Sequence, residues 1–415
     1  MSARGWFVLC LGATLAASML PAPAAAQQSQ NWKWCVNNEK ASLDLQISGC
    51  TAVIQSGKES AKNLAVAFMN RGNALDDKGE FERAIADYNQ SLQLNSNDAK
   101  AYFNRGLAYG RKNENDRAIA DYSEAVRLDP KYTRAFSNRG RLYLNKGNYD
   151  SAIADFSRTV KLDPKHADAF NNRGRSYYAK KDNDRAIADY SEAIRINPKE
   201  SAYLRNRGLA LAAKGDQDRA ISDYDQAIRV DPKFAEAFNS RAVSYEDKKD
   251  YDRAMADYNE AIRLNPKYVL AISNRALLHE TKNNYDLAAA DFGELTKLEP
   301  ANAGHWNSRC WARAIVGKEL QEAVADCNES LRLRPGDAET FDSRGFAYLK
   351  LGDFEKSIAD YDAALKIDPK KAYSLYGRGF AKQKKGDQAD GDADMSAAKA
   401  IRADIADIFT RYGVK

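Results

Sequence analysis

At 415 residues the chain is longer than one ordinary globular core, so either several domains or a repeat array is expected. Charged residues make up 29% and only 10 prolines occur, which is typical of a helical protein with much solvated surface. The 63 basic and 58 acidic residues are mixed along the chain, without a basic stripe carrying interleaved aromatics, which argues against a nucleic-acid-binding protein.

The first segment, residues 1–26, is predicted to be a cleaved signal peptide. Arg4 supplies a positive start, residues 5–20 are apolar, and residues 21–26 are small or proline, with cleavage expected after Ala26. The apolar run is shorter than the roughly 20 residues that a membrane span needs, so no stable membrane insertion is expected after cleavage. We therefore expect a periplasmic protein.

The next segment, residues 27–64, is expected to be a degenerate helical cap on the units that follow it. Residues 44–50 can be laid on residues 116–122 of those units, so that Cys50 takes the place of Tyr122. An atypical unit at the end of a repeat array is what a cap requires.

Residues 65–404 contain ten units, each marked by an arginine in the same place. These are Arg71, Arg105, Arg139, Arg173, Arg207, Arg241, Arg275, Arg309, Arg344 and Arg378. The step is 34 residues except for one step of 35 in the eighth unit, where we place the extra residue in the turn at 317–320. A fixed period of this length decides the architecture, because each unit must stack on its neighbours to bury its apolar face.

Each unit is expected to be a helical hairpin. Gly or Asn stands where the first helix should end in a left-handed residue, and in most units a proline follows the second helix. The turn residues are Gly79, Asn113, Gly147, Gly215, Asn283, Gly352 and Gly386. Small residues such as Gly106 let the two helices approach closely, and an aromatic such as Tyr122 gives each hairpin a large body that only stacking can bury.

The order Gly106, Tyr109, Ala118, Tyr122, Ala125 and Pro130 resembles the tetratricopeptide repeat (TPR). The resemblance covers residues 65–404 and implies an all-α fold, a right-handed superhelical α-solenoid of antiparallel helix pairs in an exported bacterial TPR protein. Residues 405–415 are then a C-terminal capping tail. If this tail folds back, Ile405 and Phe409 would cover aromatic side chains of the last units.

One departure from the family runs through all ten units. Arg stands where the family usually has leucine before the glycine, and every unit carries Asp before its aromatic, for example Asp121 and Asp155. We predict a structural ladder of Arg–Asp pairs, formed within a unit or to the next one. Ten equal carboxylates are not an acid–base site, because such chemistry needs one differentiated group.

Four cysteines follow the leader, an even number in a chain bound for an oxidising compartment. Cys310 and Cys327 replace the small residue and the aromatic of one unit, positions that lie level across a hairpin, so we expect a disulfide between them. In the cap, Cys50 takes the aromatic position and Cys35 lies on a short preceding helix, which gives the second expected pair. Zinc is the alternative, but CxxC motifs are lacking and the three histidines are scattered, so no metal or cofactor is predicted.

Motifs for phosphate binding, nucleophilic hydrolysis or metal-dependent hydrolysis are absent from the sequence, so no catalytic residue is assigned and an enzyme is not expected. Members of the TPR family typically bind peptides or partner helices along the inner face of the first helices. One row there resembles the asparagine ladder with which some members hold an extended peptide: Asn70, Asn104, Asn138, Asn172, Asn206 and Asn274. The alternative is that these amides hold adjacent repeats together.

Two further positions on the same face vary along the array and should set specificity. One of them forms a second row, which is basic at Arg141 and Arg175 in the first half and aromatic at Trp311, Phe346 and Phe380 in the last units. The sequence thus predicts a periplasmic adaptor that binds a peptide or helix of a partner protein in the concave groove. A chaperone or assembly factor for exported envelope proteins is the alternative, while the partner, the pathway and the oligomeric state stay open.

Overall fold

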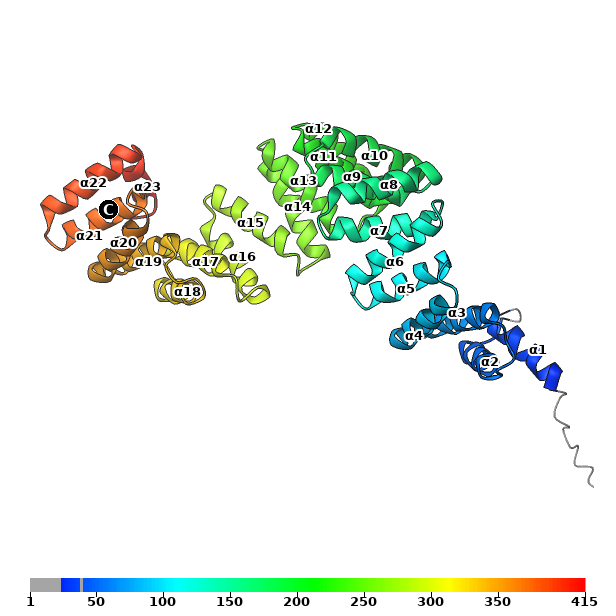
Figure 1. Ribbon diagram of the computed structural model, residues 1–415. Coiled ribbons are helices and arrows are strands. Elements are labelled where there is room, and N and C mark those ends of the chain that lie inside the picture. The colour runs from blue at the N-terminus through cyan, green and yellow to red at the C-terminus, as the bar shows by residue number, and fades with distance from the viewer. Residues whose placement is uncertain (1–23, 38–39, 415) are drawn as a thin grey trace, which may run out of the picture. The chain divides into compact units, whose positions relative to one another are not determined.

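The computed structural model describes residues 24–37 and 40–414, so the predicted signal peptide lies outside the described part except for its last three residues. The described residues form 23 helices and no strand, and the chain is an all-α repeat solenoid, which confirms the predicted fold class. Figure 1 labels the helices in chain order. The chain divides into an N-terminal part, Met1–Lys180, and a C-terminal part, Lys181–Lys415.

The helices of the N-terminal part are α1 (Ala24–Cys35), α2 (Leu43–Gln55), α3 (Ala61–Asp77), α4 (Phe81–Leu94), α5 (Ala99–Arg111), α6 (Asn115–Leu128), α7 (Thr133–Asn145), α8 (Tyr149–Leu162) and α9 (Ala167–Ala179). Those of the C-terminal part are α10 (Asn183–Ile196), α11 (Ser201–Ala213), α12 (Gln217–Val230), α13 (Ala235–Asp247), α14 (Tyr251–Leu264), α15 (Val269–Thr281), α16 (Tyr285–Leu298), α17 (Ala303–Val316), α18 (Leu320–Leu333), α19 (Ala338–Leu351), α20 (Phe354–Ile367), α21 (Ala372–Lys384), α22 (Gln388–Ile401) and α23 (Ile405–Arg411).

From α3 to α22 the odd-numbered helices are the first helices of the hairpins and the even-numbered helices are the second. First helices of successive hairpins contact one another within each part, for example α3 with α5 and α17 with α19. We call the surface that these odd-numbered helices form the first-helix face. It is the surface on which the sequence places the candidate binding residues.

The hairpin turns hold left-handed residues where the sequence predicts them. All seven predicted Gly and Asn residues have positive φ, between 58° and 96°. Two turns that lack Gly or Asn use Lys181 and Lys249 instead, with φ of 61° and 60°. In the eighth hairpin α18 begins three residues after the left-handed Gly317, whereas α16 begins two residues after Asn283, so the extra residue lies in the predicted turn.

Glycine lets the two helices of a hairpin meet at the aromatic side chain. A Cβ atom on Gly106 would lie 2.8 Å from Cε1 of Tyr122, and one on Gly208 would lie 2.5 Å from Cε1 of Tyr224. Real carbon atoms do not approach so closely, so a larger residue would push the helices apart. Tyr122 and Tyr224 are buried as a result, which confirms the predicted close approach.

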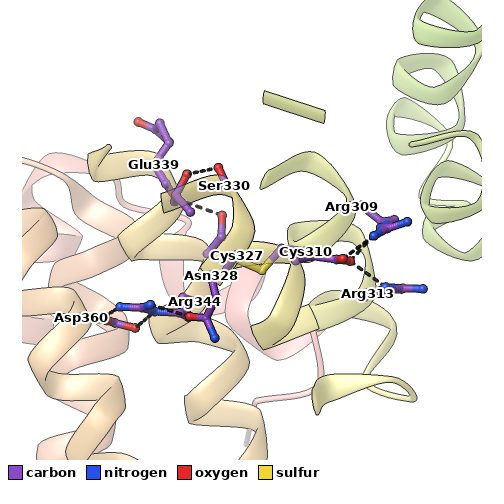
Figure 2. Close-up of a disulfide and its surroundings, with 12 residues drawn as sticks. Arg309, Cys310, Arg313, Cys327, Asn328, Ser330, Glu339, Arg344 and Asp360 are labelled. Atoms are coloured by element: carbon purple, nitrogen blue, oxygen red, sulfur yellow. Dashed lines mark hydrogen bonds and ion pairs between the residues drawn. A yellow bond between two sulfur atoms is a disulfide. The ribbon is translucent and has the colours of Figure 1, made fainter. Parts of the chain in front are cut away.

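Both predicted disulfides are present. Cys35–Cys50 joins α1 to α2, and Cys310–Cys327 joins α17 to α18. Figure 2 shows the second bond between its two helices, with Arg309 on one side and Arg344 on the other. It stands in place of the contact between a small residue and a large one, such as Gly106 and Tyr122, that other hairpins make. The segment bounds at 27–64, 65–404 and 405–415 remain predictions.

None of the helices in residues 24–37 and 40–414 has both the length and the apolar composition needed to cross a membrane.

Candidate functional site

The arginine that marks each repeat holds the aspartate of its own hairpin in a bidentate ion pair. In Arg105, Nε donates to Oδ2 of Asp121 at 2.8 Å and Nη2 donates to Oδ1 at 2.6 Å. The predicted ladder is confirmed in nine hairpins: Arg71–Asp87, Arg105–Asp121, Arg139–Asp155, Arg207–Asp223, Arg241–Asp257, Arg275–Asp291, Arg309–Asp326, Arg344–Asp360 and Arg378–Asp394. The two remaining residues of the predicted ladder, Arg173 and Asp189, belong to different parts of the chain.

The same arginine also reaches the hairpin before its own. Its remaining nitrogen, Nη1, donates to a side-chain oxygen on the preceding second helix, for example from Arg139 to Ser123 at 2.9 Å. All ten arginines do this, and the acceptors are Thr51, Asn89, Ser123, Ser157, Ser191, Asp225, Asn259, Thr296, Asn328 and Asp362. Each arginine therefore ties two hairpins together, an arrangement that a planar guanidinium with five donors allows.

These carboxylates are buried, so their charge is stable only because it is paired. Burial raises the pKa of Asp155, while the bonds from Arg139 act in the opposite direction. The side chain of Asp155 is 6% exposed and that of Arg139 is 16% exposed. Such a pair holds the guanidinium in place within its hairpin, from where Nη1 of Arg139 reaches Ser123 of the preceding one.

The predicted asparagine row is partly engaged in stacking the repeats. Asn104 donates to Asn73 at 2.8 Å, and Asn274 donates to Asn239 at 3.1 Å, in each case across to the preceding first helix. Asn138 shares a hydrogen bond with the hydroxyl of Tyr122.

Of the other members of the asparagine row, Asn172 accepts from Arg175 at 3.2 Å, and Asn70 and Asn206 are half-buried. The basic members of the second row, Arg141 and Arg175, are exposed. For Asn104 and Asn274 the stacking role that the sequence left open is thus present. Their role in binding a peptide remains a prediction.

The second row, two residues after each marking arginine, is apolar throughout the C-terminal part. We call it the apolar row, and its members are Leu209, Val243, Leu277, Trp311, Phe346 and Phe380. Val243 on α13 is 40% exposed and Leu277 on α15 is 49% exposed. Val243 and Leu277 were not predicted as binding residues, although they occupy the same position in the repeat as Trp311, Phe346 and Phe380.

The aromatic end of the apolar row is covered by the chain itself. The ring centroids of Phe346 and Phe409 are 5.7 Å apart, and Tyr412 packs edge-on against Trp311 at 5.6 Å. Phe346 is 1% exposed, and Ile405 is fully buried in the same core, which confirms that the C-terminal tail folds back over these units. In this conformation the ring of Phe346 is therefore not open to a partner.

The remaining aromatic positions are less enclosed. Trp311 and Phe380 are half-buried, and the ammonium group of Lys384 lies 5.0 Å from the ring centre of Phe380. Lys350 donates to the backbone oxygen of Tyr412 at 2.6 Å and so ties the tail to α19. Tyr412 also packs against the rings of Tyr285, Trp311 and Phe346, a set of contacts that the sequence did not predict.

Family models for the TPR match the chain over most of its length. Models described as tetratricopeptide repeat match residues 99–132, 137–201, 205–269 and 274–338, and one described as TPR repeat matches 72–113 and 345–386. The chain belongs to the tetratricopeptide-repeat family. TPR proteins are scaffolds for protein–protein interaction, their fold is generally non-catalytic, and the matched models indicate no catalytic family.

Solved structures similar to this TPR protein include MamA, with 26% identity over 39% of this chain and 95% of that chain and a TM-score of 0.38. YrrB, titled a TPR protein with an unusual peptide-binding site, has 26% identity over 47% of this chain and 97% of that one, with a TM-score of 0.40. The C-terminal part of a TPR protein from Cytophaga hutchinsonii has 19% identity over 59% of this chain and 98% of that chain, with a TM-score of 0.49. The comparison with curated proteins gives no match.

Proposed function

We propose that this TPR protein is a periplasmic adaptor that binds an extended segment or helix of a partner protein on the first-helix face of its C-terminal part. The observation that carries the proposal is that this face already holds one such segment, the chain's own tail. Phe409 and Tyr412 lie against Trp311 and Phe346 of the apolar row. A surface that packs aromatic side chains from one segment has the chemistry to pack another.

The open stretch of the apolar row supplies the place for a partner. Val243 and Leu277 continue the row that the tail covers, and they are 40% and 49% exposed. Burying what remains exposed of them would contribute about 1 kcal/mol each to binding. Asn274 and Asn206 stand three residues before members of the same row, and their amides suit the polar backbone of a bound segment.

The periplasmic location is supported by the leader pattern and by the cysteines. Residues 1–26 have the order of a secretory signal peptide. The four cysteines that follow form the pairs Cys35–Cys50 and Cys310–Cys327, and structural disulfides persist in oxidising compartments.

The proposal is tested by capture of partners with the tagged mature chain from the cell envelope. The double variant Val243→Asp and Leu277→Asp should lose the partner that the wild type retains. Leu287→Asp is the matched control, because Leu287 is 52% exposed but lies on the second helix α16. Equal capture by wild type and double variant would refute the site.

The same experiment separates the adaptor from the alternative function. An adaptor should yield one stoichiometric partner, whereas a chaperone or assembly factor should yield many sub-stoichiometric ones.

A further inference from the structure

A cavity of about 340 Å³ opens on the first-helix face of the C-terminal part, next to the apolar row. It is lined from α15 by Glu280, from α17 by Asn307 and Trp311, and from α19 by Asp342. Tyr373 on α21 and Tyr412 of the tail also line it, and the remaining lining residues are Ser308, Glu339, Ser343 and Lys371. The volume is at the lower end of the range for small-ligand sites, and none of these acidic residues belongs to the Arg–Asp ladder.

Glu280 lacks the tyrosine hydroxyl that donates to its counterpart in the preceding hairpin. At the equivalent place in the preceding hairpin, Glu246 accepts a hydrogen bond at 2.9 Å from the hydroxyl of Tyr258, which lies 12 residues further on. In the next hairpin that tyrosine is Phe292, which has no hydroxyl. Glu280 accordingly accepts no side-chain hydrogen bond from the described residues, although it is half-buried.

Two further polar side chains line the cavity. Asp342 is 7% exposed, and only its Oδ1 atom accepts a hydrogen bond, from Ser374. The side-chain oxygen of Asn307 is buried and has no hydrogen-bond partner among the described residues. Asp342 therefore adds a second, buried carboxylate to the lining of the cavity, beside Glu280.

The walls between these acceptors are aromatic. Trp311 packs edge-on with Tyr412 at 5.6 Å and with Tyr373 at 6.3 Å. Aromatic faces attract a cation that has left water, most strongly where the site is dry.

The cation already present at the cavity donates a hydrogen bond to neither Glu280 nor Asp342. Lys371, whose side chain is 12% exposed, donates instead to Glu339 at 2.6 Å, and the side chain of Glu339 is 69% exposed. Glu280 and Asp342 then remain as two carboxylates that face the same space. Burial raises the pKa of Glu280 to about 7, and it raises that of Asp342 to about 6 against the influence of Lys371 and Ser374.

We infer that this cavity binds an organic cation, an alkylammonium or guanidinium group, between the carboxylates of Glu280 and Asp342. A metal ion fits less well, because no group of three or more His, Cys, Asp or Glu residues in the described part of the chain is arranged to hold one. The cation comes either from a Lys or Arg side chain of a bound segment, a source that rests on the proposed function, or from a free small amine.

The probe is n-butylammonium, titrated calorimetrically into the mature full chain, with n-butanol and butyrate as isosteric neutral and anionic controls. Butylammonium should bind, and the double variant Glu280→Gln and Asp342→Asn should bind it at least about tenfold more weakly. Glu246→Gln is the matched control outside the cavity and should bind like the wild type. Glu280→Gln alone serves as a second variant that leaves the Asp342–Ser374 bond in place.

Equal binding of butylammonium and butanol, or unchanged affinity in both cavity variants, would overturn the inference. The two possible sources separate in partner capture. If the cavity variants lose the partner as Val243→Asp and Leu277→Asp do, the cation belongs to a bound segment. If butylammonium binds but no partner depends on the apolar row, the proposed function fails and the cavity is a site for a free amine.

Discussion

Arg139 holds Asp155 with two parallel hydrogen bonds, from Nε to Oδ2 at 2.8 Å and from Nη2 to Oδ1 at 2.7 Å. Replacing Asp155 by Ala should therefore destabilise the protein strongly, by about 3 kcal/mol, because Arg139 would stay buried without its counter-charge. The free energy of unfolding in urea measures this. Arg127→Ala, which removes an exposed pair with Glu124, should change it by less than about 1 kcal/mol.

Removing both charges tests the reason for that loss. The double variant Arg139→Leu and Asp155→Leu should recover much of the stability that Asp155→Ala loses, since no buried charge is then left unpaired. If the double variant is as unstable as the sum of the two single changes, the pair itself, and not the orphaned charge, accounts for the effect.

The hairpin turn at Lys249 offers a stabilising change. Lys249 has a φ of 60°, a conformation that is unfavourable for a residue with a side chain and easy for glycine. Lys249→Gly should raise the free energy of unfolding by about 0.5–1 kcal/mol. The neighbouring Lys248→Gly is the control and should lower it, because Lys248 has a φ of −82° and pairs with Asp218. A loss of stability in Lys249→Gly would show that its side chain contributes more than the turn geometry does.

The disulfide in the eighth hairpin should be replaceable by the contact that the other repeats use. Reducing the wild type should lower its stability, on the order of 3 kcal/mol per bond for loops of this length. The double variant Cys310→Gly and Cys327→Tyr should fold and should lose less on reduction than the wild type, because only Cys35–Cys50 remains. Peptide mapping without reductant provides the independent check, and four free thiols in the exported protein would contradict both bonds.

Glu280 should make stability depend on pH. Its pKa is about 7 in the folded chain against an ordinary value of 4.5, so folding is disfavoured once the unfolded carboxyl has ionised. The wild type should lose stability relative to Glu280→Gln as pH rises from about 4.5 to 7, by on the order of 1–2 kcal/mol. Melting temperatures at pH 4 and pH 8 measure this, with the exposed Glu322→Gln as a control; an equal difference at both pH values would show that Glu280 is not desolvated.

Much of the fold could be predicted because ten units repeat one set of positions. Arg139 and Asp155 stand out as a pair since their counterparts occur in every unit, and Cys310 and Cys327 stand out because they replace two residues that meet in the other hairpins. The hydrogen bond from Arg139 to Ser123 could not be predicted in the same way, because the acceptor residue changes between Ser, Thr, Asn and Asp along the chain.

The candidate site was harder to predict, because it depends on positions at which one hairpin carries a different residue from the others. The left-handed turn at Lys249 follows from the position in the hairpin and not from the residue type. The cavity at Glu280 forms only where four first helices and Tyr412 come together, and its unpaired acid results from one tyrosine being Phe292. The sequence predicted that Phe409 would cover the aromatic end of the apolar row. The contacts of Tyr412 with Tyr285, Trp311 and Phe346 depend on how the tail folds, so they could not be predicted.

The most direct test of the account places a photo-crosslinking amino acid at Leu277, in the open stretch of the apolar row, and irradiates cells that export the protein. We expect one partner to be trapped at Leu277 and not at Leu287, which is equally exposed on a second helix. Equal trapping at the two positions, or trapping at Leu287 alone, would contradict binding on the first-helix face.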